Sequence, residues 1–230
     1  MIAVTSRTQA AGLRAASNKP TKGIPMKKAV IFGLACFSLI VTTGAMAKER
    51  IGDPYPLGNC PVSGEKLGAM GEAPVYVGED GREVRFCCAG CEKKYVAKAE
   101  EMNAEIDKKI IADQESHYPS TTCINSDAEL KDGGVSFVVG NRLVKTCCAK
   151  CEAKVKADPA AYLAKLDQQV IDAQKENYKG EVCPISGKAL GETPVEMVVA
   201  NRLVKLCCEG CKKKVNEEPL ATIEKIDAAK

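Results

Sequence analysis

A fixed internal period constrains the fold of this chain more than any other feature. Two adjacent cysteines and a third one helical turn later form the motif RFCCAGC, which returns as KTCCAKC and again as KLCCEGC. The first cysteines of these motifs are Cys87, Cys147 and Cys207, which are evenly spaced along the chain. A fixed period of this kind indicates tandem copies of one supersecondary unit.

A single cysteine precedes each motif and follows the same repeat. Cys123 and Cys183 are separated by the same interval as the motifs, whereas the interval from Cys60 to Cys123 is slightly longer. Repeat one therefore carries a three-residue insertion, most simply near Gly68–Met70. We expect three repeats, which cover residues 58–118, 121–178 and 181–230.

Each repeat begins with the sequence pattern of a turn and a hairpin. The upstream cysteine opens a short turn, as in CPVSG at Cys60. Residues with strand propensity then surround Asp80-Gly81, Gly140-Asn141 or Ala200-Asn201, where we expect two-residue hairpin turns. The second strand of each hairpin leads into the triple-cysteine motif, which begins a short helix.

A longer helix is expected to follow in each repeat. Asp158-Pro159 predicts an N-cap and a proline at the first helical position, and Ala160–Asn177 then carries Leu163, Leu166 and Val170 on one side. The predicted fold class is α+β: three tandem small modules, each made of a cysteine turn, a β-hairpin and a helix, joined by helices. Because units this small rarely bury enough apolar surface to fold unaided, a further staple is expected.

The N-terminal residues have the pattern of a secretory leader. From Met26, two lysines precede an uncharged apolar run, and small residues up to Ala47 form a cleavage site. The run is shorter than the ~20 apolar residues of a membrane span. We expect residues 1–47 to be removed after Ala47, and the mature protein to be periplasmic or secreted. Since residues 1–47 hold six of the 33 Lys and Arg and no Asp or Glu, the mature chain is acidic, and nucleic-acid binding loses its electrostatic support.

Four cysteines in each mature repeat could form a metal site. In repeat one, Cys60 would come from the turn, and Cys87, Cys88 and Cys91 from the junction of strand and helix, which is how small zinc modules assemble tetrahedral thiolate sites. Basic residues near the motifs, such as Arg85, would offset the negative charge of the thiolates. The candidate ligands are Cys60, Cys87, Cys88, Cys91, Cys123, Cys147, Cys148, Cys151, Cys183, Cys207, Cys208 and Cys211.

Two other uses of the cysteines stay open. Export permits disulfides, although adjacent Cα atoms only about 3.8 Å apart make a bridge between Cys87 and Cys88 difficult. A framework of two bridges per repeat would need other pairings. Thiol redox catalysis at Cys88-x-x-Cys91 lacks the surrounding βαβ pattern of thioredoxin-like proteins.

The spacing of the cysteines resembles the TRASH and YHS families. The shared features are the upstream cysteine, the hairpin, a C-x3-C such as Cys87 with Cys91, the aromatic Phe86 and the downstream segment DPAAYLAKL at Asp158. The resemblance implies treble-clef-like modules associated with heavy-metal sensing, trafficking and resistance. Cys88 and its counterparts depart from the pattern, as does repeat two, which lacks the proline and glycine of the opening turn.

We therefore expect an exported protein without enzyme activity that binds or buffers Zn(II) or, as a second choice, Cu(I), since thiolate sites suit both ions. Zn(II) is the expected cofactor, and metal ions are the expected partners. One alternative is an interaction scaffold, in which structural zinc folds each repeat and another surface binds a protein partner. A disulfide-stapled exported repeat protein is the other.

Overall fold

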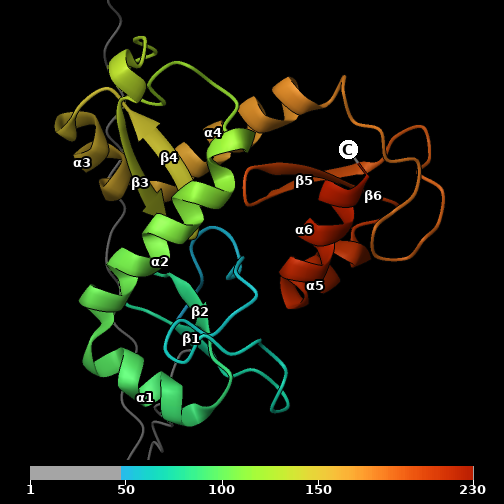
Figure 1. Cartoon of the computed structure of the whole chain (residues 1–230). Helices are drawn as coiled ribbons and strands as arrows, with labels where there is room; N and C mark the ends of the chain where they lie inside the picture. The colour runs from blue at the N-terminus through green and yellow to red at the C-terminus, as the bar shows by residue number, and fades with distance from the viewer. Residues whose placement is uncertain (1–47, 230) are drawn as a thin grey trace, which may run out of the picture. The chain divides into compact units, whose positions relative to one another are not determined.

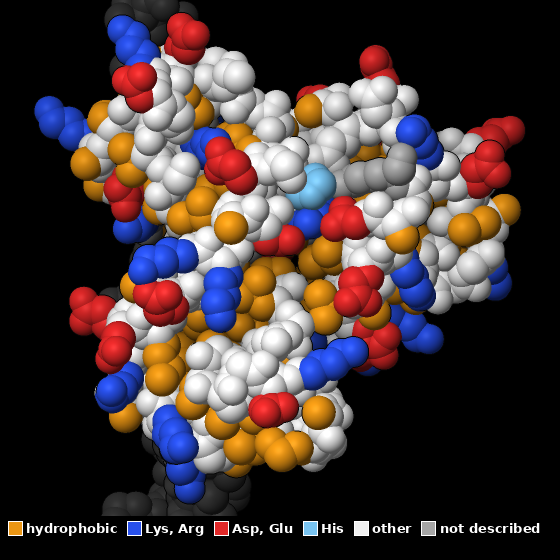
Figure 2. Space-filling model, in the orientation of Figure 1, with side chains coloured by type: hydrophobic (Ala, Val, Ile, Leu, Met, Phe, Trp, Pro, Cys, Tyr) orange, Lys and Arg blue, Asp and Glu red, His pale blue; other side chains and the backbone are white. Residues whose placement is uncertain are grey.

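A computed structural model describes residues 48–229, which have a mixed α/β fold with six α-helices and three two-stranded antiparallel hairpins (Figure 1). The expected leader, with its start at Met26 and cleavage after Ala47, lies outside the described residues. No helix within 48–229 has both the length and the apolar character needed to cross a membrane. Acidic and basic side chains are interspersed over the face shown in Figure 2.

One hairpin lies in each repeat. The strands of the three hairpins are β1 (Val75–Val77) with β2 (Glu83–Arg85), β3 (Val135–Val139) with β4 (Arg142–Thr146), and β5 (Val195–Val199) with β6 (Arg202–Leu206). The two-residue turns expected in repeats two and three are confirmed. Asn141 and Asn201 have φ of 63° and 58°, and the residues before them also have positive φ, as type I′ turns require.

The turn of the first hairpin is longer than the sequence predicts. Val77 pairs with Glu83, and the amide of Gly78 donates to the carbonyl of Arg82 over 2.8 Å. Three residues therefore lie in the loop, and Gly81 has a φ of 75°. A type I turn followed by a left-handed glycine gives this geometry, which places the register of repeat one a residue away from that of the other two.

A short and a long helix follow each hairpin. The pairs are α1 (Ala89–Ala97) with α2 (Ala99–Gln114), α3 (Ala149–Ala157) with α4 (Pro159–Gln174), and α5 (Gly210–Glu217) with α6 (Pro219–Ala228); the 3-10 turns are η1 (Glu115–His117) and η2 (Lys131–Gly133). The Asp158 carboxylate caps α4 by accepting from the amide of Ala161. The helix ends at Gln174, earlier than the expected Asn177.

Each repeat has its own small core, and the long helices also contact the next repeat. The predicted stripe Leu163, Leu166 and Val170 is buried, and its core includes Val198 of the following hairpin. Helix α2 likewise lies along β3 and β4 (Figure 1). The helices therefore join neighbouring repeats as well as completing their own.

Two hydrogen-bonded asparagines link consecutive repeats. The side-chain oxygen of Asn141 accepts from Nε of Arg82 over 3.2 Å, and that of Asn201 accepts from Nε of Arg142 over 2.8 Å. Both asparagines are fully buried. The turn of each later hairpin is thereby bound to the hairpin before it, at Arg82 just before β2 and at Arg142 in β4.

Residues before the first repeat connect all three hairpin turns. The amide of Ile51 donates to the carbonyl of Gly81, and that of Asp53 donates to the carbonyl of Gly140. The Asp53 carboxylate accepts from the amide of Ala200 and is 3.3 Å from the Arg142 guanidinium. Ile51 therefore contacts the turn of repeat one, and the buried Asp53 contacts the turns of repeats two and three.

Candidate metal centres

Each repeat brings three cysteine sulfurs into one group. Within each group all the sulfur atoms lie within 4.8 Å of one another. We call these groups the sulfur triads: Cys60, Cys87 and Cys91; Cys123, Cys147 and Cys151; and Cys183, Cys207 and Cys211. Each triad could hold a metal ion.

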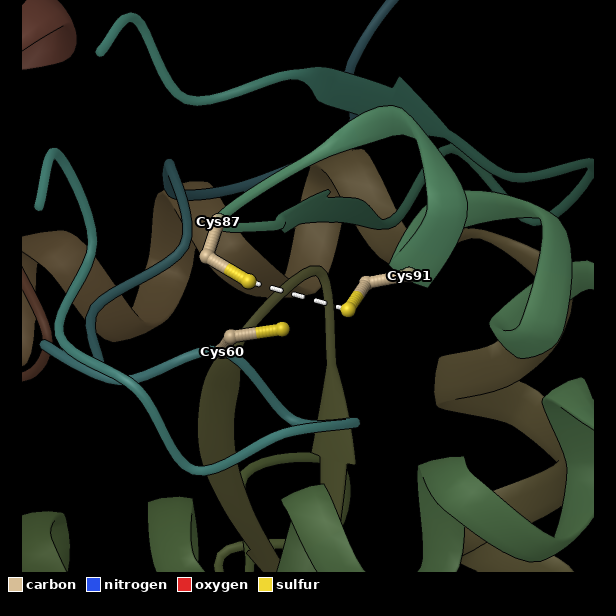
Figure 3. A group of neighbouring side chains, drawn as sticks. All are labelled: Cys60, Cys87 and Cys91. Carbon is tan, nitrogen blue, oxygen red and sulfur yellow. Dashed lines mark hydrogen bonds between the residues drawn. The ribbon is translucent and has the colours of Figure 1, made fainter. Parts of the chain in front are cut away.

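Different elements supply the three sulfurs of a triad. Cys60 lies in a tight turn, where its amide donates to Glu65 and its carbonyl accepts from Gly64. Cys87 follows strand β2, and Cys91 lies in the first turn of α1. The three side chains point toward one another, with 3.6 Å between the sulfurs of Cys87 and Cys91 (Figure 3).

The turn of repeat two keeps this geometry despite its different sequence. Asp127 stands where repeats one and three have Gly64 and Gly187, and it adopts a φ of 56°. Its amide donates to the carbonyl of Cys123 over 2.9 Å, as the two glycines do to Cys60 and Cys183. Aspartate tolerates the left-handed region better than most residues. The second triad forms even though its turn lacks both the proline and the glycine.

Hydrogen-bond donors surround the cysteine of each turn. Burial opposes ionisation of Cys60, but the Ser63 hydroxyl and the amides of Cys87, Ser63 and Val62 outweigh burial and lower the pKa of the thiol to about 6. Cys123 and Cys183 have equivalent donors, and their pKa values are also lowered to about 6. Donors of this kind stabilise the thiolate, which is the form that binds metal.

The helix cysteine of the first and third triads has the opposite tendency. Burial, together with hydrogen bonds to the neighbouring thiols, raises the pKa of Cys91 and of Cys211 to about 12. A triad of this kind holds an ionised thiol and a protonated thiol side by side. A metal cation that displaced the proton of the helix cysteine could be bound by both the turn and the helix sulfur.

A serine in each turn contacts the triad and was not anticipated from the sequence. The hydroxyl oxygens of Ser63, Ser126 and Ser186 lie 3.3, 3.5 and 3.2 Å from the sulfurs of Cys87, Cys147 and Cys207. The signal was present, because a serine recurs three residues after the first cysteine in every repeat.

A second polar contact is specific to repeat two. The Asn125 amide donates to the Cys151 sulfur over 3.2 Å, and its oxygen accepts from the Tyr162 hydroxyl. Apolar Val62 and Ile185 occupy the equivalent place in the other repeats. The middle triad therefore has a polar neighbour that the outer two lack.

The fourth cysteine of each repeat lies beside its triad and does not belong to the compact group. Cys88 is 3.7 Å from Cys91, Cys148 is 3.8 Å from Cys147, and Cys208 is 3.7 Å from Cys211, measured between sulfurs. Cys148 and Cys208 are exposed, and Cys88 is partly exposed. All twelve cysteines within residues 48–229 are free thiols.

Two basic residues beside the cysteine motifs, where we expect charges that offset the thiolates, are paired with other groups. Arg85 pairs with Glu83 and donates to the carbonyls of Asn216 and Glu217. Lys145, the equivalent residue of repeat two, pairs with Glu115. Arg85 thereby joins β2 to the end of α5, and Lys145 joins β4 to the end of α2.

Comparison of the chain with family models, with curated proteins and with solved structures finds no match in any of the three.

Proposed function

We propose that the protein binds one soft or borderline metal ion at each of its three sulfur triads, Zn(II) in the first place and Cu(I) in the second. The observation that supports this most is the repeated assembly of three sulfurs within 4.8 Å of one another. Thiolates are the preferred ligands of both ions, and Cu(I) is stable with two or three of them.

The surroundings of the triads support the same proposal. Hydrogen bonds to the turn cysteine favour its thiolate before any metal binds. In the first repeat the three triad cysteines are also part of the hydrophobic core, which includes Phe86 and Tyr95. Metal binding would therefore connect the turn, the hairpin and the helix of a small unit, as in treble-clef-like modules of the TRASH and YHS type.

The wider role that we propose is non-enzymatic binding or buffering of metal outside the cytoplasm. It rests on the secretory pattern of residues 1–47 and on the resemblance of the cysteine spacing to heavy-metal modules. A second candidate is a protein-binding scaffold with structural zinc. The placement of Cys60, Cys87 and Cys91 inside a core favours that candidate, because a metal there would staple the fold.

Native mass spectrometry of residues 48–230 tests the proposed binding. The reduced protein is titrated with Zn(II), and in parallel with Cu(I) under a reducing atmosphere. We expect three ions per chain, falling to two in Cys151→Ser, which removes one buried triad ligand. A wild-type chain that stays metal-free, or one whose mass shows oxidised cysteine pairs instead, would refute the proposal.

Metal removal separates the two roles. Chelation of Zn(II) followed by circular dichroism shows whether the apo chain keeps its helices. A folded apo form that reloads reversibly supports metal handling. An apo form that unfolds, together with slow exchange in the loaded form, supports the scaffold.

A further inference from the structure

A thiol outside the compact triad recurs at the same place in all three repeats. Cys88, Cys148 and Cys208 directly follow the strand cysteine of the triad and precede the helix cysteine by three residues. Each has its sulfur within 3.9 Å of at least one triad sulfur. We call these residues the outer cysteines.

The outer cysteines are more accessible than the turn and helix cysteines of the triads, whereas the strand cysteines vary: Cys87 is buried, Cys207 is partly exposed and Cys147 is exposed. Cys60, Cys123 and Cys183 are at most 1% exposed, and the helix cysteines of the triads are at most 8% exposed. The outer cysteines are exposed in repeats two and three and partly exposed in repeat one. A sulfur that contacts solvent thus adjoins, in every repeat, a group of sulfurs that includes two buried ones.

The backbone keeps the outer sulfurs close to the triad without placing them in it. Cys88 and Cys148 are the N-cap residues of α1 and α3, with extended φ values of −161° and −164°. The carbonyl of each accepts from the amide of the helix cysteine, Cys91 or Cys151, over about 3 Å. These bonds fix the distance between the outer residue and the helix cysteine.

Metal exchange at a buried thiolate site is helped by a further thiol that is accessible to solvent and close to the site. An ion moves between thiolate ligands most readily when the new bond forms before the old one breaks, so the receiving thiol must be reachable from solvent and adjacent to the site. The buried members of a triad meet only the second requirement. The outer cysteine meets both in every repeat; the strand cysteine of the triad also contacts solvent in repeats two and three, but not in repeat one.

We propose that Cys88, Cys148 and Cys208 are relay ligands, which take the metal ion from a solvent-borne donor and pass it to the triad. The proposal rests on metal binding by the triads. A bond between the ion and the outer sulfur forms as the bond to the donor breaks. Bonds to the triad sulfurs then form, and the bond to the outer sulfur breaks. The oxidation state of the ion does not change, and protons displaced from thiols go to solvent.

The relay role predicts separate effects on capacity and on rate. Replacing all three outer cysteines by serine (Cys88→Ser, Cys148→Ser, Cys208→Ser) leaves the triads complete, so three Zn(II) per chain are expected. Transfer of Zn(II) from the loaded protein to excess 4-(2-pyridylazo)resorcinol, followed by stopped-flow absorbance, is expected to slow at least about tenfold, which corresponds to about 1.4 kcal/mol in the barrier. The contrasting variant is Cys151→Ser, expected to lose one ion from the count.

The outcomes separate this inference from the proposed function. If the wild type binds no Zn(II), metal binding fails and the relay with it, before any variant is compared. If the triple variant has the wild-type circular dichroism but binds fewer than three ions, the outer cysteines are permanent ligands and the relay is wrong. Three bound ions with transfer at the wild-type rate also overturn it. Three ions with slowed transfer support it.

Discussion

Replacing Asn141 by glycine should destabilise the chain by about 3–5 kcal/mol. The buried Asn141 amide donates to the carbonyls of Asp53 and Glu83 over 3.1 and 2.8 Å, and its oxygen accepts from Nε of Arg82. Glycine adopts the φ of 63° without strain, so the change removes the side-chain bonds and keeps the turn. A buried group left without a partner costs about 1–3 kcal/mol, and more when it is charged. The expected loss is kept toward the low end of the summed costs of the three broken bonds, because losses at neighbouring groups are not additive.

Urea denaturation followed by far-UV circular dichroism measures the effect, with equal metal content in all samples. The matched control is Asn177→Gly, an exposed position after the end of α4, where a change within about 0.5 kcal/mol is expected. A loss in Asn141→Gly no greater than in this control would mean that the asparagine does not join the repeats.

Three further predictions concern the turns and the thiols. Gly140→Ala should lower the free energy of unfolding by at least about 2 kcal/mol, because an added Cβ would lie 2.4 Å from the Ile51 carbonyl oxygen; thermal unfolding measures this, and a stability equal to wild type would contradict it. Ser186→Ala should raise the pKa of Cys183 and weaken Zn(II) binding at pH 6.5 by ~3–10-fold, with a smaller effect at pH 9; competition with a chromophoric chelator measures this, and a pH-independent effect would contradict the cause. In the metal-free reduced protein the pKa of the turn cysteines is about 6, against an ordinary 9.0. Their ionisation therefore stabilises the fold fully above pH 9, and this stabilisation is lost as the pH falls through 6. Urea denaturation at several pH values measures this, and midpoints that do not rise between pH 6 and 8 would argue against ionised turn cysteines.

The sequence was sufficient for the parts of the fold that depend on local pattern. The even spacing of the cysteine motifs located the repeats, and the repeat register placed the hairpin turns at Gly140-Asn141 and Ala200-Asn201, where both residues are left-handed as a type I′ turn requires. The three sulfurs of each triad could be grouped for a similar reason: a turn cysteine and a strand–helix junction meet across one hairpin.

Contacts between repeats could not be predicted in this way. The polar nature of Asp53 and Asn141 gave no sign that both would be buried where the turns meet, because periodicity says nothing about how one copy packs against the next. The extra loop residue of repeat one was missed because Asp80-Gly81 has the composition of a two-residue turn, while Gly78 closes a longer one. The position of Cys88 outside the triad depends on the extended backbone at the start of α1, which the C-x-x-C spacing does not specify.

Diffraction from crystals grown with Zn(II), with data collected on both sides of the zinc absorption edge, shows directly whether zinc binds at the sulfur triads. We expect three anomalous peaks per chain, each about 2.3 Å from the three sulfurs of one triad. Triads without a peak in crystals that bind zinc elsewhere, or triad sulfurs joined in disulfides, would contradict it.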